Sequence, residues 1–148
     1  MDVVGRESAV FAEETRLSLL VRPNDIDALG HVNNAVALEY LEAGRADWLD
    51  RAGIVAGGGI IAVVARAEID YRVEVSRGTV EVRTAMADPD PTGFDPRGMN
   101  YLVRFSQRVL IPAVARPAVE AVITVAFVEE QRRRIVTLQD YLVAAPVS

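Results

Sequence analysis

A ten-residue stretch from Arg66 to Val75 restricts the fold of this chain more than any other part of its sequence. Every even position in it is charged and every odd position is apolar. This two-residue period is typical of a β-strand with one face in a core. A helix does not produce it, because helical side chains repeat every 3.6 residues. The chain is therefore predicted to build a sheet with one covered face.

Weaker alternation of the same kind predicts further strands on both sides of this stretch. They occupy about residues 16–22, 79–86, 100–111 and 117–128, with a short last strand around 135–138. Pro23 ends the first of them, because proline cannot donate a hydrogen bond to a neighbouring strand. The sequence thus predicts a run of antiparallel strands after a single early one.

One helix is predicted between the first two strands, from about Ala35 to Ala52. Small or apolar side chains recur in it at helical spacing and form one stripe for burial: Ala37, Leu41, Gly44 and Trp48. Asn33 or Asn34 can cap its start and Gly53 its end. A long helix among antiparallel strands indicates an α+β fold of one domain, in which the helix lies against the apolar face of a curved sheet.

Composition removes several classes of function. The 148 residues include no cysteine and no lysine, which excludes thiolate nucleophiles, cysteine-bound metals, Schiff bases and phosphate-loop lysines. His31 is the single histidine, so one chain cannot build a site from two or more imidazoles. The segment 88–98 begins like a calcium loop, but Met99 stands where such loops need a glutamate. We expect a hairpin loop there, no metal ion and no organic cofactor.

Charge and hydropathy bear on partners and location. A net charge of −5 argues against nucleic acid, because binding to a polyanion depends on a basic surface. No stretch approaches the roughly 18 consecutive apolar residues of a membrane-spanning helix. The first residues lack the basic flank and apolar run of a secretory signal. We therefore expect a cytosolic protein that binds neither nucleic acid nor membranes.

The segment that leads into the helix, residues 23–34, combines turn-forming residues with reactive ones. Asp27 precedes by a few residues a helix start whose unpaired N–H groups carry about half a positive charge. Such a helix start can hold an oxygen that gains negative charge, and a nearby carboxylate can act as nucleophile or as base for water. These are the requirements of acyl transfer. In the alternative interpretation, the polar side chains only form turns and cap the helix: Asp25, Asp27, His31, Asn33 and Asn34.

Eight residues from Asp27 to Asn34 read DALGHVNN and are followed on the predicted helix by Tyr40, Glu42 and Arg45. This arrangement resembles the signature of hotdog-fold acyl-CoA thioesterases of the 4-hydroxybenzoyl-CoA thioesterase type. The resemblance covers about residues 15–141 and leaves residues 1–14 as an N-terminal extension of a single domain spanning 1–148. It implies a hotdog fold, in which one long helix is wrapped by a five- or six-stranded antiparallel sheet.

The resemblance also implies an activity and roles for residues. The protein would hydrolyse a thioester of coenzyme A or of acyl carrier protein to the free acid. Asp27 would attack the thioester carbonyl or activate water, and the backbone N–H of Asn34 would bind the thioester oxygen. His31 and Asn33 would shape the loop that presents Asp27, and His31 is also a candidate for a direct catalytic role. Proteins of this type form homodimers that often pair into tetramers, with the site at the dimer interface.

Coenzyme A carries three phosphates, so an acidic protein that binds it should gather arginines at the mouth of its site. Two groups qualify, namely Arg97 in the long loop and the run Arg132–Arg134 in the last hairpin. The resemblance implies nucleotide contacts at these places. Arg97 and Arg133, together with Asn33 of the loop, are the candidates for substrate binding. The same arginines would meet the acidic surface of an acyl carrier protein. An ordinary solvated turn explains the arginine run equally well.

Departures from the pattern leave alternatives open. Ala37 stands where related sequences commonly have an aromatic residue. This replacement would enlarge or reshape the pocket that the helix lines. Glu39 and Glu42 are predicted to be surface residues, with Glu42 pairing with Arg45, although a second type of hotdog thioesterase takes its carboxylate from the helix. Gln107 is a candidate for an interface contact or for catalysis. An enoyl-thioester hydratase or dehydratase and a non-catalytic acyl-binding dimer remain as alternative functions.

Overall fold

The computed structural model describes residues 13–52 and 59–144. In chain order the strands are β1 (Thr15–Leu20), β2 (Ile60–Tyr71), β3 (Thr79–Asp88), β4 (Leu102–Leu110), β5 (Val119–Glu129) and β6 (Arg134–Val136). The helices are α2 (Asn34–Arg51) and α3 (Leu138–Ala144), with short 3-10 helices η1 (Pro23–Asp25) and η2 (Pro91–Gly93). None of the helices in these two ranges has the length and apolar content that crossing a membrane requires.

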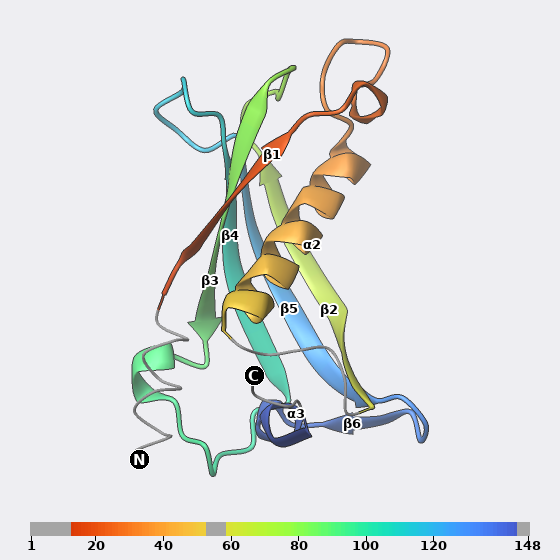
Figure 1. Ribbon diagram of the computed structural model, residues 1–148, viewed down its shortest axis with the longest axis vertical. Coiled ribbons are helices and arrows are strands. Elements are labelled where there is room, and N and C mark those ends of the chain that lie inside the picture. The colour runs from red at the N-terminus through yellow and green to blue at the C-terminus, as the bar shows by residue number, and fades with distance from the viewer. Residues whose placement is uncertain (1–12, 53–58, 145–148) are drawn as a thin grey trace.

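The strands form one antiparallel sheet in the order β1-β3-β4-β5-β2, and β6 pairs with the end of β5. Strand β5 is central, because it pairs along its length with β2 on one side and with β4 on the other. Figure 1 shows β2 at the border of the sheet. Within the described residues β2 pairs with β5 alone, so its second edge is open. An open edge of this length is a place where another strand can add.

Helix α2 lies diagonally across one face of the sheet (Figure 1). The predicted stripe is buried at all four positions, and Leu41 and Trp48 are 0% and 1% exposed. The ring of Trp48 packs edge-on against Phe105 of β4, with centroids 5.1 Å apart. The observed long helix and curled antiparallel sheet confirm the predicted α+β hotdog architecture.

Helix α2 approaches the sheet most closely at Gly44. A Cβ atom at this position would lie 2.5 Å from Val82 Cγ1 and 2.8 Å from Thr84 Oγ1. Both contact residues are fully buried on β3. A side chain at position 44 would therefore force the helix away from the sheet or displace buried neighbours.

Most predicted strand boundaries differ from the structure by one or two residues. The alternating run from Arg66 to Val75 begins inside β2, after a bulge between Val64 and Arg66, and continues past the end of the strand at Tyr71. The last strand, β6, starts at Arg134, and the residues from Leu138 onward form α3, which the sequence did not predict. Helix α2 begins at Asn34 with Asn33 as its N-cap, whereas the predicted C-cap Gly53 lies outside the described residues.

We predict that Gly44→Ala destabilises the protein by about 1–2 kcal/mol, because overpacking outweighs the roughly 1 kcal/mol that alanine gains in helix propensity. Urea unfolding followed by circular dichroism measures this change. Ala46→Gly, at an exposed position of the same helix, reports the propensity change alone. A Gly44→Ala protein more stable than the wild type would contradict the close approach.

Candidate active site

The loop between β1 and α2 is closed at its neck by backbone hydrogen bonds. Ile26 and Val32 form an isolated antiparallel bridge, and the N–H of Asp27 donates to the carbonyl of His31 over 2.8 Å. The N–H of Val32 donates to Val75, beyond the end of β2, over 2.7 Å. The tip formed by residues 27–31 is therefore held between the start of α2 and the segment that follows β2.

Asp27 is exposed at the tip of this loop, where its side chain makes turn contacts. Its Oδ1 accepts hydrogen bonds from the backbone N–H groups of Leu29 (2.9 Å) and His31 (3.2 Å). These contacts are the predicted turn. Its Oδ2 has no hydrogen-bond partner among the described residues. One carboxylate oxygen thus organises the loop, and the other remains available to a ligand.

The start of α2 presents an unpaired donor. Asn33 caps the helix with its side-chain oxygen, which accepts from Ala35 N–H over 2.9 Å. Within residues 13–52 and 59–144, the N–H of Asn34 makes no hydrogen bond, as expected at the first position of a helix. The hydroxyl of Tyr71, at the end of β2, donates to the carbonyl of Asn34 over 3.0 Å. This contact fixes the first turn of the helix against the sheet edge and leaves the N–H free.

Asp25 has a structural role rather than a chemical one. Its side chain is 2% exposed, and its Oδ2 accepts from the Tyr40 hydroxyl over 2.6 Å and from the Arg22 N–H over 2.9 Å. The Arg22 guanidinium pairs with Oδ1 at 3.0 Å. The Tyr40 hydrogen bond and the Arg22 contacts hold the pKa of Asp25 below its usual range despite burial. Burial and the adjacent carboxylate raise the pKa of Tyr40. Asp25 is thus an ionised anchor between the loop and α2.

The imidazole of His31 contacts Glu74 rather than Asp27. The ring is about one-third exposed, and its Nε2 lies 3.1 Å from Glu74 Oε2. The backbone N–H of the same residue donates to the Asp27 carboxylate. His31 therefore joins Asp27 to the segment after β2, which is the loop-shaping arrangement considered in the sequence.

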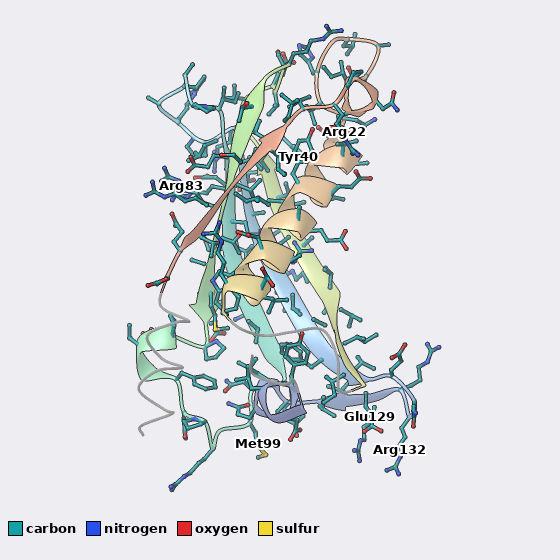
Figure 2. All side chains as sticks on the ribbon, viewed as in Figure 1. Arg22, Tyr40, Arg83, Met99, Glu129 and Arg132 are labelled. Carbon is teal, nitrogen blue, oxygen red and sulfur yellow. The ribbon has the colours of Figure 1, made fainter. Side chains whose placement is uncertain are left out.

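The candidate arginines lie at the other end of the molecule. Figure 2 shows Arg22 and Tyr40 near one end of its longest axis, and Arg132 and Met99 near the other. Arg132 and Arg134 both pair with Glu129, at 3.8 and 2.9 Å. Arg97 and Arg133 make no ion pair within the described part of the chain. One copy of the chain does not bring these two free guanidinium groups together with Asp27.

Arg45 and Gln107 form a buried connection that the sequence did not predict. Arg45 donates from Nη1 to Gln107 Oε1 over 3.0 Å, and no Glu42–Arg45 ion pair forms among the described residues. Gln107 is 1% exposed, and its Nε2 donates to the Leu41 carbonyl and to Thr84 Oγ1 over 2.9 Å each. Gln107 therefore ties α2 to β3 and β4 within one chain. The alternative interface or catalytic role for Gln107 is not supported by this burial.

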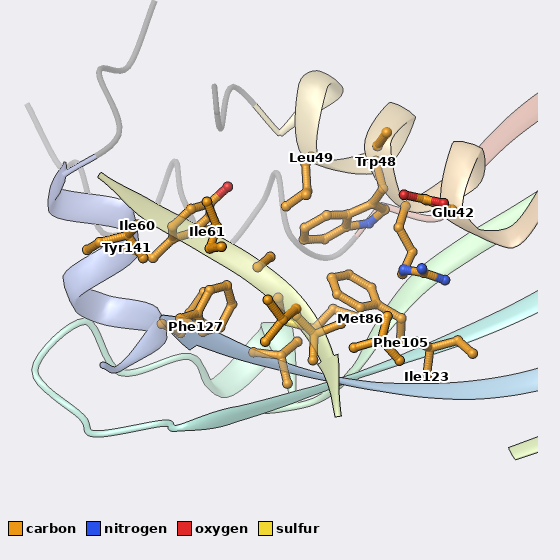
Figure 3. Close-up of a pocket in the computed structure, with 18 of the residues that line it drawn as sticks. Glu42, Trp48, Leu49, Ile60, Ile61, Met86, Phe105, Ile123, Phe127 and Tyr141 are labelled. Atoms are coloured by element: carbon orange, nitrogen blue, oxygen red, sulfur yellow. The ribbon is translucent and has the colours of Figure 1, made fainter. Parts of the chain in front are cut away.

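A large pocket lies between α2 and β2 (Figure 3). Its volume is about 800 Å³, and its helix side includes Leu38, Glu39, Glu42 and Leu49. Neither Asp27 nor Asn34 lines it, but Leu38 follows Asn34 by one helical turn, or about 6 Å. Over residues 13–52 and 59–144, no three carboxylate or imidazole side chains gather in a way that would hold a metal ion. On the helix side, the pocket lining therefore begins one turn beyond the helix start.

Sequence reasoning missed the partners that hold the site together. Tyr71 and Glu74 belong to the alternating stretch, which predicted them only as members of an apolar and a charged face. Tyr40 was singled out by the motif without a partner, and the structure supplies Asp25 as that partner. These contacts join residues 15 to 43 positions apart, and no local spacing signals them.

Comparison with known proteins identifies the architecture. A family model described as the thioesterase-like superfamily matches residues 21–145. A thioesterase from Thermus thermophilus, complexed with coenzyme A and zinc, is 27% identical over 86% of this chain and 87% of its own, with a TM-score of 0.67. A hypothetical protein from the same organism is 26% identical over 88% and 96%, with a TM-score of 0.72. A DHNA-CoA thioesterase from Staphylococcus aureus has the same fold at 13% identity, over 88% and 87%, with a TM-score of 0.72. A search of curated proteins finds no match.

We predict that Asp25→Asn lowers the free energy of unfolding by about 1–3 kcal/mol at neutral pH, because a buried hydrogen-bonded carboxylate is lost. The folded-state pKa of Asp25 is lowered, so its stabilisation is present above the unfolded pKa and is lost as pH falls through the folded value. The difference in free energy of unfolding between Asp25→Asn and the wild type should therefore become smaller below about pH 4. Urea unfolding over a pH series measures it. Glu39→Gln, an exposed partner of the same Arg22, serves as control and should change stability by less than about 0.5 kcal/mol.

Proposed function

The chain belongs to the thioesterase-like superfamily, and from this premise we propose that it hydrolyses an acyl-CoA thioester, or the thioester of an acyl carrier protein, to the free carboxylic acid. Within the superfamily we assign it to the 4-hydroxybenzoyl-CoA thioesterase type, on the motif from Asp27 to Asn34. The Thermus thermophilus thioesterase is complexed with coenzyme A, which supports coenzyme A as the carrier. No metal ion and no organic cofactor enter the proposed reaction.

The observation that carries the proposal is that two groups at the ends of one short loop have no hydrogen-bond partner among the described residues. Asp27 Oδ2 has no protein partner, and the N–H of Asn34 at the positive end of α2 has none either among the described residues. A thioester carbonyl bound to that N–H would gain stabilisation as its oxygen becomes negative. Its carbon would then face the free carboxylate oxygen of Asp27.

Two routes complete the reaction. In one, Asp27 attacks the carbonyl carbon, the C–S bond breaks, the thiolate leaves and takes up a proton, and water hydrolyses the resulting anhydride. In the other, Asp27 removes a proton from water as the water attacks, and the same thiolate leaves. Asn33 shapes the helix start, and His31, held by Glu74, acts as a positioning residue for Asp27. Both routes yield a free acid and a free thiol.

We also propose that the working unit is a homodimer joined through the open edge of β2. This edge strand carries apolar side chains that are unusually exposed, including Ile61 (44%), Val64 (52%) and Tyr71 (45%). Pairing with β2 of a second copy would satisfy the free backbone groups and cover these side chains. The expected pairing is antiparallel, because a two-fold axis relates the copies.

The charges of β2 select one register for that pairing. If Ala67 lies on the two-fold axis, Arg66 of each copy faces Glu68 of the other. If Arg66 or Glu68 lies on the axis, it faces its own charge. If Ile69 lies there, Arg66 faces Arg72 and Glu68 faces Asp70. The register centred on Ala67 is therefore the one we propose.

An antiparallel pair would complete the site. The hairpin that holds Arg133 follows β5 beside the start of β2, because Ile60 pairs with Glu129. Asp27 lies near the other end of β2, where Val32 bonds to Val75. In the dimer, Arg133 of the second copy would approach the loop of Asp27. The free guanidinium groups of Arg133 and Arg97 would then bind the phosphates of coenzyme A.

We predict that Asp27→Asn lowers kcat/KM for thioester hydrolysis by at least about a thousandfold, because nucleophile and base are removed together. Thiol release, detected with a thiol reagent, measures the rate. Asp90→Asn is the matched control, because Asp90 is an exposed loop aspartate whose Oδ1 also accepts two hydrogen bonds, from the N–H and the hydroxyl of Thr92. Asp27→Asn activity within tenfold of the control would rule out the proposed role. A change in enoyl absorbance without thiol release would show a hydratase instead.

A mixture of two impaired variants tests the shared site. Arg133→Ala should raise KM for acyl-CoA severalfold, because one phosphate contact is lost. If Asp27→Asn and Arg133→Ala proteins are dissociated and reassociated together, each mixed dimer holds one site with both residues intact. In that site, Asp27 of one copy again meets Arg133 of the other. The kinetics of the mixture should therefore contain a component with a low KM for acyl-CoA. Its absence in proven mixed dimers would contradict a site that combines Asp27 of one copy with Arg133 of the other.

A further inference from the structure

The pocket beside α2 has a lining that the proposed chemistry does not use. One wall is α2 from Leu38 to Leu49, and the opposite wall is β2 from Ile60 to Ala67. The floor consists of buried side chains of the sheet, among them Phe105, Ile123 and Phe127 (Figure 3). The floor and the strand wall are thus hydrocarbon, in a volume of about 800 Å³. A pocket of this size and lining is suited to an apolar ligand.

The pocket is elongated along the helix. From Leu38 to Leu49 the helix rises by roughly 16 Å, at 1.5 Å per residue. One leaflet of a membrane, which holds the chains of ordinary fatty acids, is about 15 Å of hydrocarbon thick. The helix wall of the pocket is therefore about as long as an ordinary fatty acyl chain. An acyl group of two to four carbons or a single aromatic ring would fill only a small part of the pocket.

The charged groups of the lining are few, and the three carboxylates lie at the rim. Glu39, Glu42 and Glu130 line the pocket from exposed positions, where their carboxylates can remain in water. Arg45 is held by Gln107. At the far end, Tyr141 is 3% exposed and its ring stacks on Phe127 with centroids 4.9 Å apart. The interior therefore presents no cluster of donors or acceptors to a polar acyl group.

The near end of the pocket lies one turn of α2 from the proposed site. Leu38 follows Asn34 by one turn of α2, so a chain that leaves a carbonyl bound at Asn34 can enter the pocket directly. We propose that the pocket binds the hydrocarbon of a long, linear acyl chain, and that the substrate class is therefore fatty acyl thioesters. This inference rests on the proposed function for the place of the thioester, but the binding of the chain itself does not depend on Asp27.

Trp48 allows chain binding to be measured without catalysis. It is the single tryptophan of the protein, and it lines the pocket. We expect saturated fatty acids from four to sixteen carbons to change its fluorescence, with an affinity that increases about fourfold per added methylene until the pocket is full. Benzoate should bind no better than the shortest acid. Asp27→Asn protein should give the same series.

Two variants narrow the pocket from opposite walls, so that one remains informative if the other does not fold. Ala46→Phe on α2 and Ala62→Phe on β2 each place a ring at a lining position. Either should weaken binding of the sixteen-carbon acid at least tenfold and leave the four-carbon acid unchanged. Ala113→Phe, at an exposed turn position away from the pocket, is the matched control. It should leave the affinities for the four-carbon and the sixteen-carbon acids unchanged.

Affinity that does not vary with chain length, or benzoate binding equal to that of the sixteen-carbon acid, would overturn this inference. The proposed function fails by a different result, namely length-dependent binding without thiol release from any acyl-CoA. The inference on the acyl chain would then stand, and the catalytic role of Asp27 would not.

Discussion

The hydrogen bond between the Tyr40 hydroxyl and the buried carboxylate of Asp25 is the contact on which the site depends. At 2.6 Å it joins the loop after β1 to the second turn of α2, and the Asp25 carbonyl also accepts from Asn33, the helix cap. The loop and the helix start are therefore held as one unit. We propose that this connection holds the Asp27 loop and the free N–H of Asn34 in the arrangement that acyl transfer requires.

The position of α2 depends in turn on its contact with the sheet. Gly44 allows the helix to lie directly on β3, and the buried amide of Gln107 bonds to the helix backbone at Leu41. Within the described chain, β2 pairs along one edge only, which leaves its other edge open. An elongated pocket lies between β2 and α2. We propose that both are used, the pocket by the acyl chain and the edge by a second copy.

Sequence patterns predicted the elements with a regular period, and they failed where the period is interrupted. The stripe of α2 from Ala37 to Trp48 was identified correctly because it repeats at helical spacing and is fully buried. The alternating run located β2 but not its full extent, because a bulge after Val64 changes the alternation and the run continues past Tyr71. Helix α3 was missed because its seven residues are too few for a helical period to stand out in the sequence. The motif identified Asp27, but the partners of Tyr40, His31 and Arg45 are distant in sequence and became visible only in the fold.

A structure of the wild-type protein with an acyl-CoA analogue, in which a methylene group replaces the thioester sulfur, tests the central claim most directly. The account predicts that the analogue's carbonyl oxygen lies about 2.7–3.1 Å from the Asn34 nitrogen, with the Asp27 carboxylate against the carbonyl carbon. A carbonyl bound elsewhere, with the Asn34 N–H still free and Asp27 facing solvent, would contradict it.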